Sequence, residues 1–310
     1  MISVIFPGQG SQTVGMCSDF YNKFERVKKI FKQVDQILNF PLSDIVLNGP
    51  ADQLNLTQNT QPSIMMVGYS IYSVLKNEFG INLNNEAKFF AGHSLGEYTA
   101  LVCSDSLTLE TATNLLHQRG KFMQEAVPEG KGSMLAILGL ENDKILEEIK
   151  AVSSDGVCEI ANDNCPGQIV VSGEKNVIEK MSDNFKKKSI RSIILPVSAP
   201  FHCSLMKNAA ENMKSKITDA VFKKPNPGII SNVTAKIEND PATIKELLIK
   251  QITSTVRWRE SLEYMINNEV DQFIEIGPGK VLSGLVKRTN RKIKISNLNS
   301  LEDINNYKNK

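Results

Sequence analysis

The sequence predicts an α/β protein with a mainly parallel sheet, helices on both faces of that sheet, and a small βαββαβ unit inserted into the chain. Short apolar runs typical of buried strands alternate with longer stretches of helical spacing, which indicates parallel strands joined by helices. The middle of the chain departs from this alternation by placing two strands in succession. The chain has 310 residues, of which 41% are hydrophobic and 23% charged, as is usual for globular proteins.

The first predicted elements follow the alternation in order. Residues 1–6 form an apolar run of strand length, and residues 20–40 carry apolar side chains at helical spacing. Further elements are expected at 63–79 (helix), 87–91 (strand), from Leu95 onward (helix) and at 107–124 (helix). Strands at 228–233 and 272–276, with helices between and after them, continue the same pattern towards the other end of the chain.

The middle segment predicts a domain of its own. Its elements are a strand at 133–139, a helix at 141–152, strands at 157–162 and 168–172, a helix at 175–187 and a strand at 190–197. This order is the split βαβ arrangement of a ferredoxin-like unit, with Gly130 and Gly132 at its entry and Pro196 and Pro200 at its exit. We therefore expect residues 128–197 to form an inserted small domain, and residues 1–127 and 198–310 to form the large α/β catalytic domain.

Composition excludes several classes of function. A formal charge of +2 gives no general attraction to nucleic acid or to membrane surfaces, and no apolar run approaches the ~20 residues that span a bilayer. The N-terminal run is too short for a signal peptide. The five cysteines never form a CxxC pair and the three histidines never form HExxH, which favours a reducing, cytoplasmic location and a site without metal.

Residues 92–96 (GHSLG) fit the G-x-S-x-G nucleophile elbow. An apolar strand leads into this motif and a helix-forming run follows it, so the turn would present the Ser94 hydroxyl at a helix N-terminus. There the Leu95 N–H can donate to an oxyanion. The alternative is an ordinary strand-to-helix turn in which Ser94 caps the helix.

A nucleophilic serine needs a base, and the chain offers three histidines. His202 follows a turn and precedes a helix, a loop position from which an imidazole can be aimed at the serine. His117 lies among polar neighbours on a helix and is expected to face solvent, and His93 is expected to pack structurally inside the elbow. We therefore predict His202 as the base.

Arg119 occupies the apolar stripe of its helix, between Leu115 and Leu116 on one turn and Phe122 and Met123 on the next. A guanidinium buried there needs a partner, because an unpaired buried charge costs several kcal/mol. The partner is either an internal Asp or Glu, or a carboxylate on the substrate held by the two-pronged guanidinium. The sequence does not separate these two possibilities.

A glycine loop follows the first strand in residues 6–12 (FPGQGSQ). It lacks the third glycine of the dinucleotide fingerprint and the lysine of a phosphate loop, so both of those functions are excluded. What remains is exposed backbone N–H at the carboxyl end of a strand, where ligands of α/β sheets bind. Gln9 could supply a second oxyanion donor.

Six motifs, in order, resemble those of the malonyl-CoA:acyl carrier protein transacylases of fatty-acid synthesis and the related acyltransferase domains of polyketide synthases. The similarity covers essentially the whole chain. The motifs are FPGQGSQ (6–12), GHSLGEY (92–98), QRG (118–120), ANDNCPGQ (161–168), PFH (200–202) and EIGPGK (275–280).

The resemblance implies a role for each matching residue. Ser94 corresponds to the acylated nucleophile, His202 to its base, and Arg119 to the residue that binds the malonyl carboxylate. The same comparison implies backbone oxyanion donors at Gln9 and Leu95, a main-chain carbonyl at Gln251 that orients the histidine, and an α/β-hydrolase-like large domain. Phe201 resembles the malonyl-selecting version of its loop. Thr255 replaces a proline of the family, which predicts a less constrained backbone near Gln251.

The activity implied is ping-pong transfer of malonyl from malonyl-CoA, through a malonyl-serine, to the phosphopantetheine thiol of acyl carrier protein. This reaction needs no permanently bound cofactor and would supply extender units for fatty-acid synthesis. Three alternatives stay open at this stage: a serine hydrolase such as a thioesterase, an acyltransferase that serves a polyketide pathway, and a non-catalytic binding module. A hydrolase has no need for the cation at Arg119.

Overall fold

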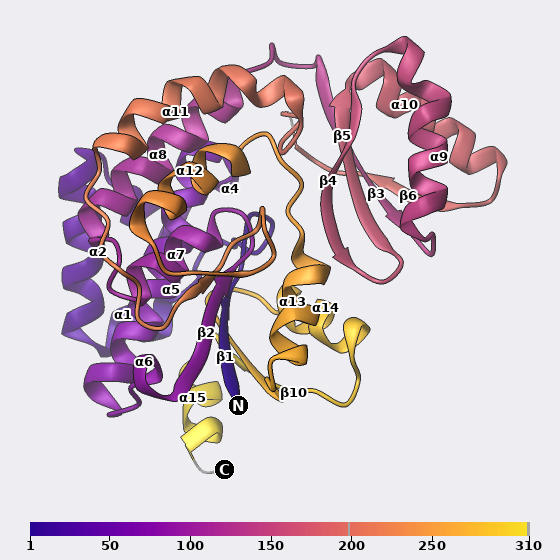
Figure 1. Cartoon of the computed structure of the whole chain (residues 1–310). Coiled ribbons are helices and arrows are strands. Elements are labelled where there is room, and N and C mark those ends of the chain that lie inside the picture. The colour runs from indigo at the N-terminus through magenta and orange to yellow at the C-terminus, as the bar shows by residue number, and fades with distance from the viewer. Residues whose placement is uncertain (198, 309–310) are drawn as a thin grey trace.

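The computed structural model describes residues 1–197 and 199–308. A six-stranded sheet forms the centre of the larger part (Figure 1). Its strands, in spatial order, are β10 (Lys294–Leu298), β9 (Gln272–Ile276), β1 (Ile2–Phe6), β2 (Ala87–Gly92), β7 (Ile229–Ile230) and β8 (Ile237–Glu238). All neighbours pair in parallel except β7 and β8. The predicted α/β class with a mainly parallel sheet is confirmed.

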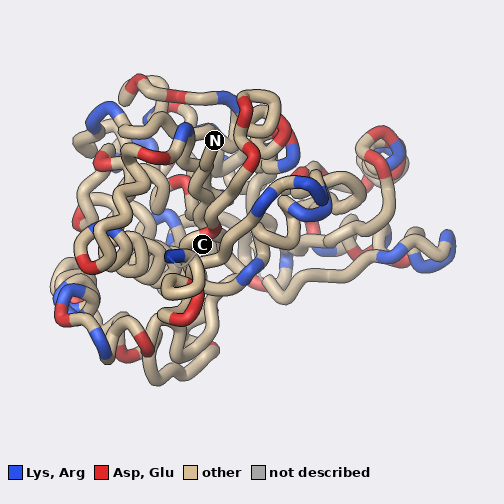
Figure 2. The backbone as a smooth tube through the Cα atoms, turned by 90° about the horizontal axis from the view of Figure 1, so that it is seen from below, with Lys and Arg blue, Asp and Glu red and all other residues tan. Residues whose placement is uncertain are grey.

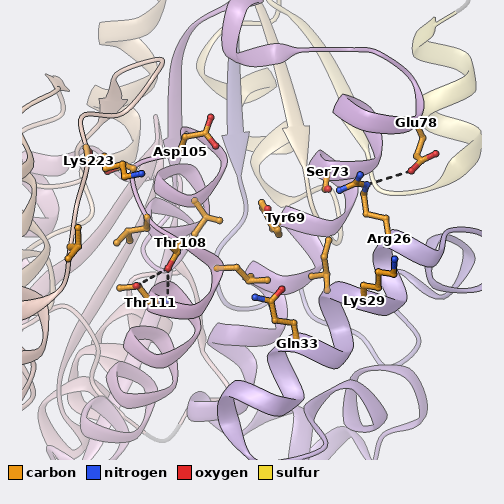
Figure 3. Close-up of a pocket in the computed structure, with 16 residues that line it drawn as sticks. Arg26, Lys29, Gln33, Tyr69, Ser73, Glu78, Asp105, Thr108, Thr111 and Lys223 are labelled. Carbon is orange, nitrogen blue, oxygen red and sulfur yellow. Dashed lines mark hydrogen bonds and ion pairs between the residues drawn. The ribbon is translucent and has the colours of Figure 1, made fainter.

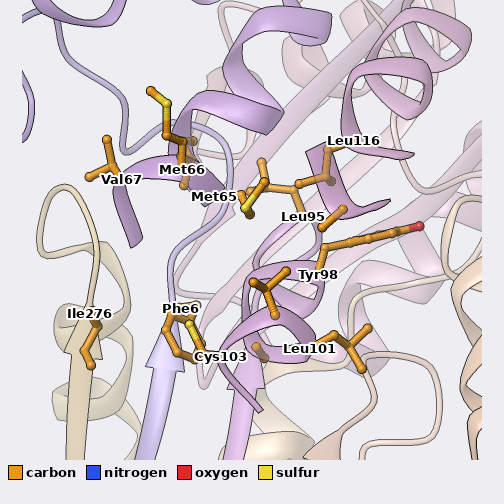
Figure 4. Close-up of a cluster of buried hydrophobic side chains, with 14 of the residues drawn as sticks. Phe6, Met65, Met66, Val67, Leu95, Tyr98, Leu101, Cys103, Leu116 and Ile276 are labelled. Carbon is orange, nitrogen blue, oxygen red and sulfur yellow. The ribbon is translucent and has the colours of Figure 1, made fainter. Parts of the chain in front are cut away.

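Alternate residues of β1 face opposite sides of the sheet, as a strand buried on both faces requires. Val4 and Phe6 belong to one hydrophobic core, and Ile5 to another. On the first face, α5 (Thr57–Glu78) and α7 (Gly96–Cys103) pack against the strands, and Figure 4 shows their side chains around Phe6. On the second face lie α13 (Trp258–Asn267) and α14 (Val281–Thr289).

The remaining helices of the larger part surround this core and its rim (Figure 1). They are α1 (Ser18–Lys23), α2 (Glu25–Leu38), α3 (Leu42–Asn48), α4 (Ala51–Asn55), α6 (Leu83–Glu86), α8 (Leu109–Glu125), α11 (Lys207–Asp219), α12 (Pro241–Gln251) and α15 (Leu301–Lys308). Lys and Arg are interspersed with Asp and Glu along the chain (Figure 2), in keeping with the small net charge. Among the described residues, no helix combines the length and apolarity needed to cross a bilayer.

A second, four-stranded antiparallel sheet stands beside the larger part (Figure 1). Its chain order is β3 (Gly132–Leu138), α9 (Asn142–Val152), β4 (Cys158–Cys165), β5 (Gln168–Glu174), α10 (Lys175–Lys187) and β6 (Arg191–Ile194), and its spatial order is β4-β5-β3-β6. The strands share a separate hydrophobic core with α9 and α10. This sheet is tied to the larger part where the Asp163 N–H donates to Val256 O at 3.0 Å.

Several elements differ from their predicted bounds, and three of the differences concern how an element begins, breaks or pairs. The helix expected at 20–40 is two helices, because Phe24 adopts an extended backbone (φ −118°, ψ 118°) between α1 and α2. The helix expected from residue 63 begins at Thr57 and contains Pro62. The strand expected at 228–233 pairs only over Ile229–Ile230, because Asn232 turns towards the site described below.

Candidate active site

Ser94 lies in the sharp turn between β2 and α7, with a left-handed φ of 54°. The two glycines of the motif make this turn possible. A Cβ at Gly92 would lie 1.9 Å from the Gly96 carbonyl, and a Cβ at Gly96 would lie 2.3 Å from Phe6 O. A strained backbone of this kind persists only where its surroundings hold it in place, and it presents the serine at the start of a helix.

His202 is hydrogen-bonded to the serine: Nε2 lies 2.7 Å from Ser94 Oγ. On the other side of the ring, Nδ1 lies 2.9 Å from the main-chain oxygen of Gln251. A carbonyl oxygen only accepts, so Nδ1 carries the ring proton and Nε2 is free to accept the serine proton. Burial, with Arg119 nearby, lowers the pKa of His202 to about 3. The imidazole is therefore neutral, the form in which it acts as a base.

Arg119 is fully buried on α8 (0% exposed) and is held mainly by amide oxygens. Its Nη1 donates to Gln61 Oε1 at 2.8 Å, and its Nη2 donates to Gln251 Oε1 at 2.8 Å and to Ser94 Oγ at 3.1 Å. Its Nε has no hydrogen-bond partner within 1–197 and 199–308, and no ion pair involves Arg119 there. Of the two partners that the sequence left open, an internal carboxylate in direct contact is absent from this described region.

The proposed oxyanion donors flank the nucleophile. Gln9 lies in the glycine loop after β1 and lines the cavity at Ser94, and Leu95 immediately follows the serine at the start of α7. Neither backbone N–H donates to an acceptor in the part of the chain that the structure describes. An oxyanion contact at these two N–H groups therefore stays a prediction.

Asn232, which sequence reasoning missed, holds the elbow from the next strand. Its Oδ1 accepts from the Ser94 N–H at 2.7 Å, and its Nδ2 donates to Gly92 O at 2.7 Å. The residue follows the short strand β7 at the carboxyl edge of the sheet, next to β2. A polar residue at the end of an apolar run was the available signal. Gln61 was missed for a different reason, since it lies inside a buried helix with no local motif.

The cavity at Ser94 has a volume of about 370 Å³ and lies between the loops that follow β1 and β2 and the second sheet. Its lining includes Met134 and Asn162 from the second sheet, together with Phe201 of the histidine loop. A larger cavity of about 790 Å³ lies beyond the other end of α7 (Figure 3) and shares no lining residue with the first. Arg26 and Glu78 in that cavity pair with each other at 3.6 Å, and the described residues that line it include no hydrogen-bonded nucleophile–base pair. The chemistry therefore belongs to the smaller cavity.

The other two histidines serve the fold. His93 Nε2 lies 2.9 Å from Asn164 Oδ1 and its ring packs 5.5 Å from the Trp258 ring, which agrees with the predicted packing role. The prediction that His117 faces solvent is wrong: it is half-buried, and Nδ1 lies 3.0 Å from Gln58 O. Pro62, four residues after Gln58, has no N–H with which to bond that carbonyl, so the imidazole of a neighbouring helix takes its place.

The backbone after Gln251 is better anchored than the loss of a proline predicts. Thr255 Oγ1 donates to Ile160 O at 2.5 Å, and the Val256 N–H donates to Ala161 O at 2.8 Å. Both acceptors belong to β4. These bonds supply a constraint where the proline ring is missing.

This α/β fold brings together a serine on a sharp strand-to-helix turn, a histidine hydrogen-bonded to it and a buried arginine beside them, an arrangement typical of enzymes that use a serine nucleophile. A family model described as the acyl transferase domain matches residues 4–308. The chain belongs to the acyl transferase family.

The similarity to curated relatives is high over nearly the whole length. The malonyl CoA-acyl carrier protein transacylase of Bacillus subtilis (strain 168) is 43% identical over 295 residues, which cover 94% of this chain and 92% of the relative. The protein of the same name from Staphylococcus aureus (strain MRSA252) is 41% identical over 307 residues, which cover 98% and 97%. The resemblance drawn from the six motifs is confirmed.

Solved structures agree with the fold. The crystal structure of acyl-carrier-protein-S-malonyltransferase from Bartonella henselae superposes with a TM-score of 0.96 at 42% identity, and the match covers 99% of this chain and 98% of the other. A malonyl-transacylase in complex with a type II polyketide acyl-carrier protein has a TM-score of 0.95 at 38% identity, with 100% and 99% covered. That second protein is described bound to its carrier protein.

Proposed function

We propose that this protein transfers the malonyl group from malonyl-CoA to the phosphopantetheine thiol of acyl carrier protein, and so supplies extender units for fatty-acid synthesis. It is an acyltransferase, and its relatives carry the name of this reaction. The observation that carries the assignment is the buried guanidinium of Arg119, which within residues 1–197 and 199–308 is hydrogen-bonded to amide and hydroxyl oxygens and lies 3.1 Å from Ser94 Oγ. A cation in that position can bind a carboxylate attached to the thioester being cleaved.

In the first half of the reaction, Ser94 attacks the malonyl thioester. His202 Nε2 takes the hydroxyl proton as Oγ bonds to the carbonyl carbon, and the carbonyl oxygen becomes an oxyanion near the Gln9 and Leu95 N–H groups. The intermediate collapses with cleavage of the C–S bond. The proton on His202 passes to the CoA sulfur, which leaves as the thiol, and malonyl remains on Ser94 as an ester.

In the second half, the phosphopantetheine thiol of the carrier protein attacks that ester by the reverse route. His202 takes the thiol proton, a new C–S bond forms, and the proton returns to Ser94 Oγ as the ester bond breaks. The Gln251 carbonyl, 2.9 Å from Nδ1, holds the other ring proton on Nδ1, so Nε2 is the nitrogen that takes and returns the transferred proton. No metal and no permanently bound cofactor takes part in this scheme.

The architectural assignment belongs to the same proposal. We assign residues 1–127 and 198–310 to an α/β-hydrolase-like large domain and residues 128–197 to a ferredoxin-like small domain. The elbow after β2 supports the first assignment, and the order β3-α9-β4-β5-α10-β6 supports the second. A cytoplasmic location is also proposed, and the five buried free cysteines agree with a reducing compartment.

Intact-protein mass spectrometry after brief exposure to malonyl-CoA tests this function. The expected result is one malonyl adduct that is absent from Ser94→Ala and that disappears when holo acyl carrier protein is added, with malonyl-carrier protein as the product. Rapid release of free malonate without carrier protein would indicate the hydrolase instead. Absence of any adduct would indicate the binding module.

A further inference from the structure

Glu97 is a buried carboxyl group that the reaction scheme does not use. It lies in the first turn of α7 and is 1% exposed. Its Oε2 accepts from the Asn232 N–H at 3.1 Å and from Gln251 Nε2 at 2.8 Å, and no ion pair involves it within the described residues. Burial raises the pKa of Glu97 to about 7. Burying a carboxyl group costs free energy, so its contacts with two site residues call for a functional explanation.

The side-chain amide of Gln251 connects Glu97 to Arg119. Its Nε2 donates to Glu97 Oε2 at 2.8 Å and to Ser94 O at 3.1 Å, while its Oε1 accepts from Arg119 Nη2 at 2.8 Å. An amide has one donor end and one acceptor end. If the Gln251 amide were rotated by half a turn, its N–H groups would face the N–H groups of Arg119. Its oxygen would then face two other acceptor oxygens, Glu97 Oε2 and Ser94 O. By accepting from Gln251 Nε2, Glu97 therefore favours the amide orientation in which Gln251 Oε1 faces Arg119.

Asn232 forms a second connection from the same carboxyl group. Its backbone N–H donates to Glu97 Oε2, and its side chain holds the Ser94 N–H and the Gly92 carbonyl. Glu97 Oε2 therefore anchors both Asn232 and Gln251. Asn232 holds the turn that carries Ser94. Gln251 contacts Arg119 through its side chain and His202 through its main chain.

We propose that Glu97 is a positioning residue for malonyl transfer, acting through Gln251 to aim the Arg119 guanidinium at the substrate carboxylate and through Asn232 to hold the Ser94 turn. This inference rests on the proposed function. It predicts that loss of the Glu97 acceptor reduces selectivity for malonyl over acetyl, because the acetyl group has no carboxylate for Arg119 to bind. A purely structural Glu97 would affect both substrates alike.

The test compares Glu97→Met, which keeps the length of the side chain and removes the acceptor, with Glu97→Gln, which keeps an amide oxygen able to accept from both donors. Glu275→Met is the matched control. Glu275 is also fully buried, in β9, and accepts from Leu282, Ser283 and Asn297, with no contact to the site. For each variant, rate constants of Ser94 acylation are measured with malonyl-CoA and acetyl-CoA, alongside a thermal melt.

We expect Glu97→Met to lower the malonyl-to-acetyl ratio by ~10-fold or more, the effect of a misaligned charge-assisted hydrogen bond. Glu97→Gln should stay within ~3-fold of wild type, and Glu275→Met should melt earlier with its ratio unchanged. If Glu97→Met does not fold, Gln251→Met breaks the same link and must lower the ratio in the same way.

An unchanged malonyl-to-acetyl ratio in folded Glu97→Met overturns the proposal. If Glu97→Met does not fold, an unchanged ratio in Gln251→Met overturns it. An equal fall in Glu275→Met, or a fall in Glu97→Gln as large as in Glu97→Met, would also overturn it. Failure of the proposed function looks different, because wild-type protein would then either form no malonyl-Ser94 or release free malonate rapidly without carrier protein.

Discussion

Arg119 Nη2 donates to Ser94 Oγ at 3.1 Å while His202 Nε2 lies 2.7 Å from the same oxygen. The serine hydroxyl gives its proton to the neutral imidazole and accepts from the guanidinium, so both neighbours favour negative charge developing on Oγ. A substrate carboxylate bound to Arg119 would then lie beside Ser94. In the proposed mechanism, activation of the serine and binding of the malonyl carboxylate would therefore share one residue.

Ser94→Ala should abolish the malonyl adduct and leave the fold intact. The geometry of the turn depends on Gly92, Gly96 and the Asn232 contacts to backbone atoms, none of which needs the hydroxyl. Intact-protein mass and a thermal melt measure the two effects. A malonyl ester persisting on another side chain would show that the nucleophile is misassigned.

His202→Ala should slow acylation by ~10²–10⁴-fold, the usual cost of losing a general base. His117→Ala is the matched control: it removes the hydrogen bond with Gln58 O, so we expect a loss of ~1 kcal/mol in stability and near wild-type acylation. Rapid-quench acylation rates compare the two variants. Similar rates in both would place the base elsewhere.

Acylation should persist at acid pH. Because the pKa of His202 is lowered from 6.5 to about 3, the neutral base survives as pH falls and is lost only near the lowered value. Between pH 7.5 and 5 the rate should change by less than ~3-fold, whereas a histidine with an ordinary pKa would lose ~30-fold. Rates measured in both wild type and Glu97→Gln exclude a contribution from titration of Glu97. A ~30-fold loss in both proteins contradicts the assignment.

The same shift predicts a difference in stability. Below pH 6.5 the unfolded chain protonates His202 while the folded protein does not, so stability falls as pH decreases towards the lowered pKa. His202→Ala removes this linkage. Its melting temperature should therefore fall less than that of wild type when pH is lowered from 7 to 5, as thermal melts in matched buffers would show. A larger fall in the variant would mean that the imidazole is not kept neutral.

Gly92→Ala should prevent correct formation of the elbow. The added Cβ would lie 1.9 Å from the Gly96 carbonyl, which is backbone and cannot move aside. Gly284→Ala, on α14 with no atom within 4 Å of the added Cβ, is the control and should be neutral or stabilising by up to ~1 kcal/mol. Soluble yield and thermal melts report both. Wild-type stability in Gly92→Ala would contradict the described geometry.

Sequence reasoning reached the features that short segments encode. The strand, the two glycines and the helix around Ser94 are contiguous, and the period of the apolar residues placed Arg119 on a buried stripe. It could not reach contacts that the fold makes between distant segments. Glu97 and Asn232 are 135 positions apart, and Gln61 reaches Arg119 across 58 positions. Gln61 carries no local sign of the site, and neither the place of Glu97 in its motif nor that of Asn232 after an apolar run shows which residue it contacts.

Two errors have a common physical cause. A helix start is expected at residue 63, immediately after Pro62, yet α5 begins at Thr57 and carries the proline within it. The carbonyl that the proline leaves free, at Gln58, is bonded by His117, the residue predicted to face solvent. A tertiary contact thus compensates for the helix-breaking effect of Pro62. The sequence around Gln58 does not predict this contact, and neither does the sequence around His117.

We propose above all that Arg119 binds the malonyl carboxylate. The most direct test is the ratio of kcat/KM for malonyl-CoA to kcat/KM for acetyl-CoA in Arg119→Ala. A charge-assisted hydrogen bond contributes about 1.5–3 kcal/mol, so the ratio should fall ~10- to 150-fold in a variant that still melts cooperatively. Arg119→Lys should recover only part of the loss, because an ammonium cannot make the planar two-pronged contact. An unchanged ratio in well-folded Arg119→Ala would contradict the account.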